Sequence, residues 1–283
     1  MRFATRPVCQ VAIRTVAVNA QFRDIRRTSA RGYSADMAEA VTAEAPNLGK
    51  PWILRQDWVN LSFLHWAVEP ASIAQFYPPG TEPDVFEGRS YVGLVPFQMA
   101  NTGPAHGPAL LRTILETNVR LYSVDGTGRR GVVFLSLDSN RPDVVAAART
   151  VFGLPYRWAR MSYQQRAGRH TYRSILRWPR VTATSSIEVQ VGEVLTPGPR
   201  EHFLTARWGL HLARAGHTWY LPNDHPAWTL RTAELVCFAD DGLFASVGMP
   251  DLGERPPDHV AFSAGVAARF GWPVLATTPR RPA

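Results

Sequence analysis

The feature that most restricts the fold is a repeated alternation between Trp52 and Trp272, where short apolar runs are separated by clusters of Gly and Pro. Runs that are rich in β-branched and aromatic residues and bounded by turn residues predict strands. Many short strands at close spacing are typical of a mainly antiparallel sheet or barrel. The sequence predicts eight strands, at residues 91–99, 113–124, 131–138, 171–178, 185–194, 216–221, 233–238 and 259–263.

Helical patterns are few, and they occur at residues 70–77, 141–152 and 198–209. The last of these begins with proline and has an acidic residue in its first turn, as helix N-termini prefer. The expected fold class is therefore α+β and dominated by β-structure, with a few peripheral helices. Because no linker or repeat interrupts the pattern, residues 51–275 are predicted to form one domain, and residues 276–283 a tail.

Residues 1–50 differ from the rest, because they are rich in arginine and small residues and show no sustained hydrophobic period. Their composition resembles that of a transit segment. An alternative is that translation starts further along the chain, with Met37 as the natural beginning. In both cases the segment is expected to be a disordered or misassigned leader outside the fold.

Charge and cysteine usage exclude several classes of protein. The net charge of +8 divides into +4 over residues 1–50 and +4 over the remainder, so no dense basic stripe is present and no nucleic-acid partner is expected. Cys9 and Cys237 do not make a disulfide framework, and no apolar run reaches the roughly 20 residues of a membrane helix. We therefore expect a cytoplasmic protein without a membrane partner, and the sequence leaves its oligomeric state open.

A row of polar residues occupies one face of the strand predicted at residues 113–124. Successive side chains of a strand point to opposite faces, and neighbours on one face lie roughly 6.5–7 Å apart. Such a row lines either a polar pocket or the wet face of an ordinary sheet. The next strand, 131–138, is apolar on both faces, which indicates that it is buried on both sides. A strand paired beside it cannot have one face fully exposed to water, so the pocket is favoured. The row consists of Glu116, Asn118, Arg120 and Tyr122.

A second cluster follows the helix predicted at residues 141–152, in the sequence FGLPYRWARM. Tyr156 offers a hydroxyl, and Arg157 offers a guanidinium that suits carboxylates. The alternative is that Tyr156 and Trp158 only cover the core. His65 and His225 both stand beside tryptophan and are expected to be packed imidazoles. No histidine spacing suits a metal, and no nucleotide-binding motif is present, so we expect neither a metal nor a cofactor.

Seven blocks of sequence occur in a fixed order between about Trp52 and Trp272. They are WVNLSFLHW, VFEGRSYVGLVPFQM, ETNVRLY, GVVFLSLD, GLPYRWARM, FLTARWGL and DHPAWTL. Taken together, these blocks resemble the DUF2071 family of uncharacterised proteins, also called YqjF-like. That family is more distantly similar to the acetoacetate decarboxylase superfamily, so the resemblance implies a conical, largely antiparallel β-barrel with an internal cavity.

The resemblance also implies a change in chemistry. In those decarboxylases a glycine-x-proline turn precedes the lysine that forms an imine, and a glutamate on an earlier strand faces it. Here the turn matches residues 153–155, Tyr156 takes the place of the lysine, and Glu116 is the plausible counterpart of the glutamate. A phenol cannot form an imine, and the only lysine is Lys50 in the leader. Decarboxylation or aldol chemistry through a lysine is therefore not expected.

Three functions remain open. The first is a binding protein for a small carboxylate, and the second is a non-covalent lyase, hydratase or isomerase with Glu116 as base and Tyr156 as acid. The third is an interaction module in which Glu116 and Arg120 form a structural pair. In the first, Arg120 and Arg157 would hold the anion. The predicted catalytic residues are Glu116 and Tyr156, and the predicted ligand contacts are Asn118, Arg120, Tyr122, Arg157 and His65.

Overall fold

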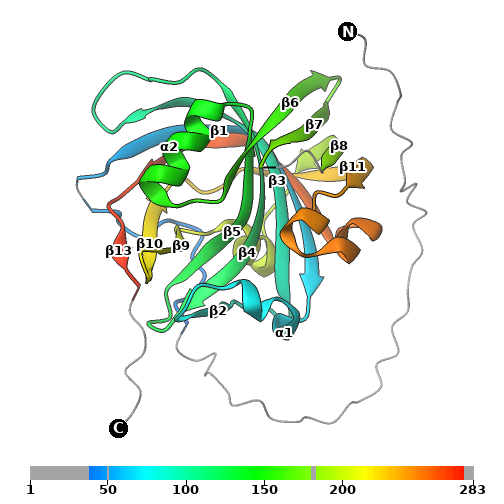
Figure 1. The fold of residues 1–283 in the computed structure, drawn as a ribbon. Coiled ribbons are helices and arrows are strands. Elements are labelled where there is room, and N and C mark those ends of the chain that lie inside the picture. The colour runs from blue at the N-terminus through cyan, green and yellow to red at the C-terminus, as the bar shows by residue number, and fades with distance from the viewer. Residues whose placement is uncertain (1–37, 50, 180–182, 277–283) are drawn as a thin grey trace, which may run out of the picture.

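A single large sheet dominates the computed structural model, which describes residues 38–49, 51–179 and 183–276 (Figure 1). Its strands are β1 (Leu54–Val68), β2 (Thr81–Pro83), β3 (Ser90–Pro104), β4 (Ile114–Asp125), β5 (Arg130–Ser139), β6 (Tyr156–Arg166), β7 (Arg169–Trp178), β8 (Thr184–Val194), β9 (Gly209–Arg214), β10 (His217–Asp224), β11 (Leu230–Asp241), β12 (His259–Phe270) and β13 (Val274–Leu275). The helices are α1 (Pro70–Ile73), α2 (Pro142–Phe152) and α3 (Pro199–Thr205), with 3₁₀ turns at Ala74–Phe76, Ala245–Val247 and Pro250–Glu254.

The sheet closes on itself. Its strand order runs β5-β6-β7-β8-β11-β12-β1-β3-β4, and β4 pairs again with β5, which completes a ring. β9 and β10 form a second connection between β5 and β12. Among the described strands only the β5–β6 and β5–β9 pairs are parallel. The predicted α+β class with a mostly antiparallel sheet is therefore confirmed, and closure leaves few exposed strand edges.

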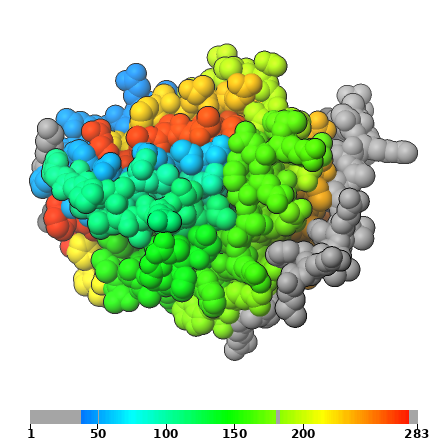
Figure 2. Space-filling view, turned by 90° about the horizontal axis from the view of Figure 1, so that it is seen from above, coloured from blue at the N-terminus to red at the C-terminus, as the bar shows by residue number. Residues whose placement is uncertain are grey.

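Each of the eight predicted strands overlaps an observed strand and extends at most one residue beyond it, but β1, β2, β6, β9 and β13 were not predicted. β1 is a central strand, and its second half has apolar residues at consecutive positions because both of its faces are covered. Leu64 and Trp66 belong to one hydrophobic cluster, and Leu61 and Phe63 to another. β1 thus separates two parts of the core. Figure 2 shows the segments of β12, β1 and β3 (red, blue and teal) side by side on one face.

The predicted helices are confirmed with small changes. α2 and α3 both begin at a proline, and each has an acidic residue in its first turn. α2 ends at Gly153, whose φ of 71° is left-handed and suits glycine at this position. The helix predicted at residues 70–77 is only one α-helical turn followed by a 3₁₀ turn.

The boundary predicted at residue 50 is not a break in packing. The amide of Glu39 donates to the carbonyl of Gly128, and the Arg130 guanidinium donates to the carbonyl of Glu39. Val41 packs against the cluster that contains Tyr122. Residues 38–49 therefore belong with the domain rather than with a separate leader. The rest of the predicted leader, including Met37 and Lys50, lies outside the described residues, as does most of the predicted tail.

No helix in the described ranges has the length and apolar character needed to span a membrane.

Candidate functional site

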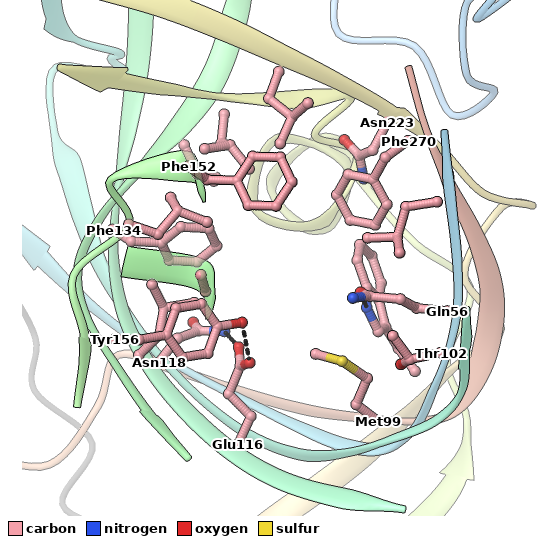
Figure 3. A pocket seen from close by; sticks show the side chains of 18 of the residues that line it. Gln56, Met99, Thr102, Glu116, Asn118, Phe134, Phe152, Tyr156, Asn223 and Phe270 are labelled. Atoms are coloured by element: carbon pink, nitrogen blue, oxygen red, sulfur yellow. Dashed lines mark hydrogen bonds between the residues drawn. The ribbon is translucent and has the colours of Figure 1, made fainter. Parts of the chain in front are cut away.

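A cavity of about 400 Å³ lies inside the ring of strands (Figure 3). Its walls come from β1, β3, β4, β5 and β10, with α2 along one side and the segment after α3 along another. Phe152, at the end of α2, points into the cavity. The walls are mainly apolar with few polar groups, which is the usual composition of a small-molecule site, and the volume falls within the usual range.

The polar row on β4 faces this cavity. Glu116, Asn118 and Arg120 all line it, so the alternative of a wet sheet face is wrong. Tyr122 continues the row and is fully buried, but it lies beyond the cavity lining. Its hydroxyl accepts hydrogen bonds from the Arg120 guanidinium at 3.2 and 3.3 Å. Tyr122 therefore positions Arg120 rather than contacting the open space.

Two irregular strands bring further residues to the same space. β5 has one extra residue relative to β4 between Phe134 and Ser136, which is a β-bulge. The bulge reverses the alternation, so that Phe134 and Leu137 both line the cavity although they are three positions apart. β1 has a similar irregularity at Asn60, whose φ is 53°. The strict alternation used for sequence analysis cannot reveal such reversals.

Glu116 and Tyr156 form a buried pair at one side of the cavity. The Tyr156 hydroxyl donates to Oε2 of Glu116 at 2.7 Å, and Nδ2 of Asn118 reaches Oε1 at 3.5 Å (Figure 3). Burial raises the pKa of Glu116 to about 7, although the hydrogen bonds from Tyr156 and Asn118 oppose this. Burial, followed by the Glu116 charge, raises the pKa of Tyr156 well above its ordinary value. Tyr156 therefore remains a proton donor, while Glu116 is poised between its two protonation states near neutral pH.

Arg120 provides a cation at another part of the cavity. Apart from Tyr122, its guanidinium donates to the carbonyl of Leu204 at 3.3 Å and lies over the ring of Phe63, 5.7 Å from the centroid. Within the described ranges, no carboxylate lies within ion-pair distance of it. Arg120 and Glu116 do not form the structural pair considered from the sequence. The charge of Arg120 is therefore balanced by no anionic side chain in this part of the chain.

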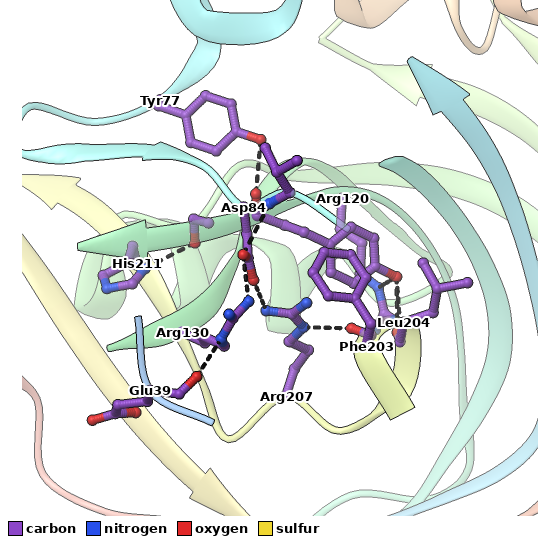
Figure 4. A network of polar contacts seen from close by, with 12 residues as sticks. Glu39, Tyr77, Asp84, Arg120, Arg130, Phe203, Leu204, Arg207 and His211 are labelled. Carbon is purple, nitrogen blue, oxygen red and sulfur yellow. Dashed lines mark hydrogen bonds and ion pairs between the residues drawn. The ribbon is translucent and has the colours of Figure 1, made fainter. Parts of the chain in front are cut away.

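Arg207 is a second buried cation at the cavity, and sequence analysis missed it. Asp84 lies between Arg130 and Arg207 and forms ion pairs with both (Figure 4). Nε of Arg207 donates to the carbonyl of Phe203 at 2.8 Å, while its Nη2 is buried and has no partner among the described residues. One carboxylate thus serves two arginines, which leaves positive charge in excess here. Asp84 is 123 positions away from Arg207, so no local pattern could have revealed the pair.

Aromatic rings form another part of the wall. The rings of Trp58 and Trp228 stack with centroids 6.2 Å apart, and His225 lies 4.7 Å from Trp228. All three residues line the cavity. Burial lowers the pKa of His225 to about 4, so its imidazole is neutral at pH 7. His225 is packed between aromatic rings, as its neighbouring tryptophan in the sequence predicted.

Besides Tyr122, two further residues predicted as ligand contacts lie away from the cavity. Arg157 is on the opposite face of β6 from Tyr156, where it pairs with the buried Asp138 at 2.5 Å and donates to Ser246 at 2.7 Å. Adjacent residues of a strand face opposite ways, so Arg157 and Tyr156 cannot share one pocket. The prediction that Arg157 holds a ligand in this cavity is corrected: its partner is Asp138.

His65 also lies outside the cavity lining. It is fully buried, with Nε2 at 2.7 Å from the Tyr122 hydroxyl and Nδ1 at 3.0 Å from Nδ1 of His259. Burial, followed by the positive charge of neighbouring groups, lowers its pKa well below the ordinary value. His65 thus forms a hydrogen bond with Tyr122 outside the cavity lining. The prediction that His65 contacts a ligand directly is corrected. Within the described residues no cluster of His, Cys, Asp or Glu could hold a metal ion.

The arrangement of the strands is that of acetoacetate decarboxylase-like proteins. An acetoacetate decarboxylase-like enzyme from Sphingomonas wittichii RW1 superposes with a TM-score of 0.57 at 10% identity, covering 82% of this chain and 95% of that chain. The enduracididine biosynthesis enzyme MppR complexed with pyruvate superposes with a TM-score of 0.52 at 14% identity, covering 81% of this chain and 92% of that one. At these identities the likeness shows the fold alone, and it confirms the fold that the resemblance implied.

Residues 55–267 match the DUF2071 family, described as an uncharacterized conserved protein, and the chain belongs to this family. The uncharacterized protein YqjF of Bacillus subtilis (strain 168) is 28% identical over 187 residues, which is 65% of this chain and 77% of that protein. The resemblance found in the seven sequence blocks is therefore confirmed.

Proposed function

We propose that this protein binds a small organic carboxylate in the cavity, without imine chemistry. The observation that carries the proposal is Arg120, a partly buried cation that lines an apolar cavity and has no anionic partner among the described residues. A charge in such surroundings is costly unless an opposite charge compensates it. Guanidinium groups bind carboxylates with two parallel hydrogen bonds, so a bound acid would supply the missing charge.

The surroundings of Arg120 support an anion rather than a neutral ligand. Arg207 and Arg130 share the single charge of Asp84, so the net charge of these three side chains is also positive. His225 is neutral and adds no competing charge, and the mainly apolar walls lower the local dielectric constant, which strengthens the attraction. MppR, which shares the fold, is complexed with pyruvate in a solved structure, so a protein with this fold binds a small carboxylate. The cysteine usage supports the further proposal of a reducing, cytoplasmic setting.

A thermal-shift screen tests the proposal. Straight-chain and aromatic carboxylic acids are compared with the corresponding primary amides, which keep the shape and lose the charge. Acids that bind the folded state raise the melting temperature by mass action, and the amides are expected to have little effect. The proposal fails if no acid shifts wild type, or if acids and amides shift it equally.

A second candidate is a non-covalent lyase, hydratase or isomerase, and the Glu116–Tyr156 pair favours it. A carboxyl group with a pKa near 7 can both take and return a proton at neutral pH, as an acid–base catalyst requires. If turnover of a bound acid is found, Glu116→Gln is expected to lower kcat by about 10²–10⁴-fold, the usual contribution of one acid–base group. Unchanged kcat in that variant would remove Glu116 from the mechanism.

A further inference from the structure

Glu116 and Arg120 stand at two separate positions along one strand of the cavity wall. Both side chains belong to the same face of β4, four residues apart, so their Cα atoms are separated by about 13 Å at a rise of about 3.3 Å per residue. No ion pair joins them, as described above. The cavity wall therefore carries two separate polar groups on one strand, which are called the Glu116 station and the Arg120 station below.

The space between the two stations is mainly apolar. Phe134 and Leu137 of the neighbouring strand β5, which pair with Arg120 and Asn118, line it, and Leu154 and Phe152 extend it toward α2. Asn118, which lies between the stations in the sequence, directs its amide nitrogen toward Glu116. A ligand that reaches from one station to the other must therefore carry an apolar body.

The Glu116 station has spare hydrogen-bonding capacity. Oε2 accepts a short bond from Tyr156, but the only contact of Oε1 within the described residues is the 3.5 Å approach of Asn118, which is at the limit for a hydrogen bond. A buried carboxyl oxygen with so weak a partner favours a further donor or, when protonated, an acceptor. The side chain is 3% exposed, so bulk water does not satisfy it freely.

We infer that the ligand is bifunctional: a carboxylate that pairs with Arg120, an apolar body, and a second polar group at the far end that hydrogen-bonds to the Glu116–Tyr156 pair. This inference rests on the proposed function and narrows it to one class of acid. A terminal hydroxyl fits the far station in both protonation states of Glu116, because a hydroxyl both donates and accepts.

The test compares two series of acids by isothermal titration. One series contains straight-chain acids from butyrate to dodecanoate, and the other contains the same acids with a hydroxyl on the terminal carbon. At the chain length that spans the two stations, the hydroxyl is expected to improve affinity by about tenfold, the strength of one good hydrogen bond. At shorter lengths the hydroxyl has no partner and is expected to weaken binding.

Variants assign the effect to the two stations. The double variant Glu116→Leu, Tyr156→Phe replaces both members of the short hydrogen bond by apolar groups of similar size, so neither is left without the other, and Asn118 loses only its 3.5 Å contact with Oε1. It is expected to lose the tenfold gain from the hydroxyl, so that a plain acid and its hydroxylated counterpart bind it with similar affinity. Arg120→Gln is expected to weaken both series equally, and the exposed Arg173→Gln is the control for charge.

The outcomes separate this inference from the proposed function. If plain acids bind through Arg120 but the hydroxyl gives no gain at any length, or if the double variant keeps the gain, the inference is overturned and the binding function stands. If no acid of either series binds wild type, both are overturned.

Discussion

At the scale of the residue, the surroundings of a side chain decide its protonation state and its partners. Glu116 and Tyr156 were identified from the sequence because strand alternation and the turn at residues 153–155 pointed to them, but their protonation states follow mainly from burial. Arg157 shows the opposite case. The Arg157 guanidinium was predicted to bind an anion. Adjacent positions of a strand face opposite ways, however, and Arg157 pairs with Asp138 on the face of β6 opposite to Tyr156.

Glu116 gives the stability of the protein a defined pH dependence. Its pKa is about 7 in the folded protein and 4.5 ordinarily, so the folded state binds this proton more tightly. The stabilisation is fully present below pH 4.5 and is lost as the pH rises through 7. Urea denaturation of wild type and Glu116→Gln from about pH 4 to about pH 8 should show the variant gaining about 3 kcal/mol relative to wild type. A difference that does not change with pH would contradict the buried carboxyl.

The phenol at position 156 predicts the result of imine trapping. Residues 51–283 contain no lysine, so borohydride reduction in the presence of pyruvate is expected to leave this part of wild type without an adduct. Tyr156→Lys places an amine beside Glu116 and is expected to gain the mass of a reduced adduct at residue 156, located by peptide mass spectrometry. A wild-type adduct within residues 51–283 would contradict the loss of imine chemistry.

At the scale of the element, the sequence was most informative where glycine and proline mark the ends. The prolines that begin α2 and α3, and the glycine that ends α2, are local signals that do not depend on the rest of the fold. β1 and β6 were missed for a different reason, since Gly153 and Pro155 stand directly before β6. β1 is covered on both faces and loses its alternation, while β6 begins with alternating aromatic and arginine residues and continues as a polar strand. Their assignment depends on the neighbours that cover them, which only the folded sheet supplies.

Substitutions of Gly153 test whether the left-handed conformation at the end of α2 requires glycine. The φ of Gly153 is 71°, and a Cβ there would meet the nearest atoms of Arg214 at 3.6 Å, an ordinary contact. Gly153→Ala is therefore expected to cost only the conformational penalty, about 1–2 kcal/mol in the free energy of unfolding, measured in urea. Gly153→Asn, which tolerates this conformation better, should cost less. Equal losses for both variants would show that the penalty is not conformational.

At the scale of the whole molecule, closure of the sheet brings together residues that the sequence keeps far apart. The row on β4 could be predicted because it is a local pattern on one strand. Arg207, Trp58, His225 and Trp228 could not, since they reach the cavity from β1, from the segment after α3 and from the loop between β10 and β11. The resemblance to a family gave the closed fold, but the side chains that meet inside it depend on bulges and registers that no single segment encodes.

Substitution of Asp84 tests the ion pairs that join distant segments of the chain. Asp84 joins the segment after β2 to Arg130 on β5 and to Arg207 after α3, and all three groups are largely buried. Removing one partner of a buried ion pair typically costs about 3–5 kcal/mol, so Asp84→Asn should lose about this much in the free energy of unfolding. Asp143→Asn, at an exposed pair with Arg141, is the control and should change stability little. Similar losses in the two variants would contradict the bridging role of Asp84.

The most direct test of a carboxylate held by Arg120 is the affinity of octanoate for three proteins, measured by isothermal titration. Wild type and Arg173→Gln are expected to bind octanoate equally, and Arg120→Gln at least about tenfold more weakly, since a charge-assisted hydrogen bond contributes that much or more. Equal binding by all three proteins, or no binding by wild type, would contradict the proposal that Arg120 binds the carboxylate of a ligand.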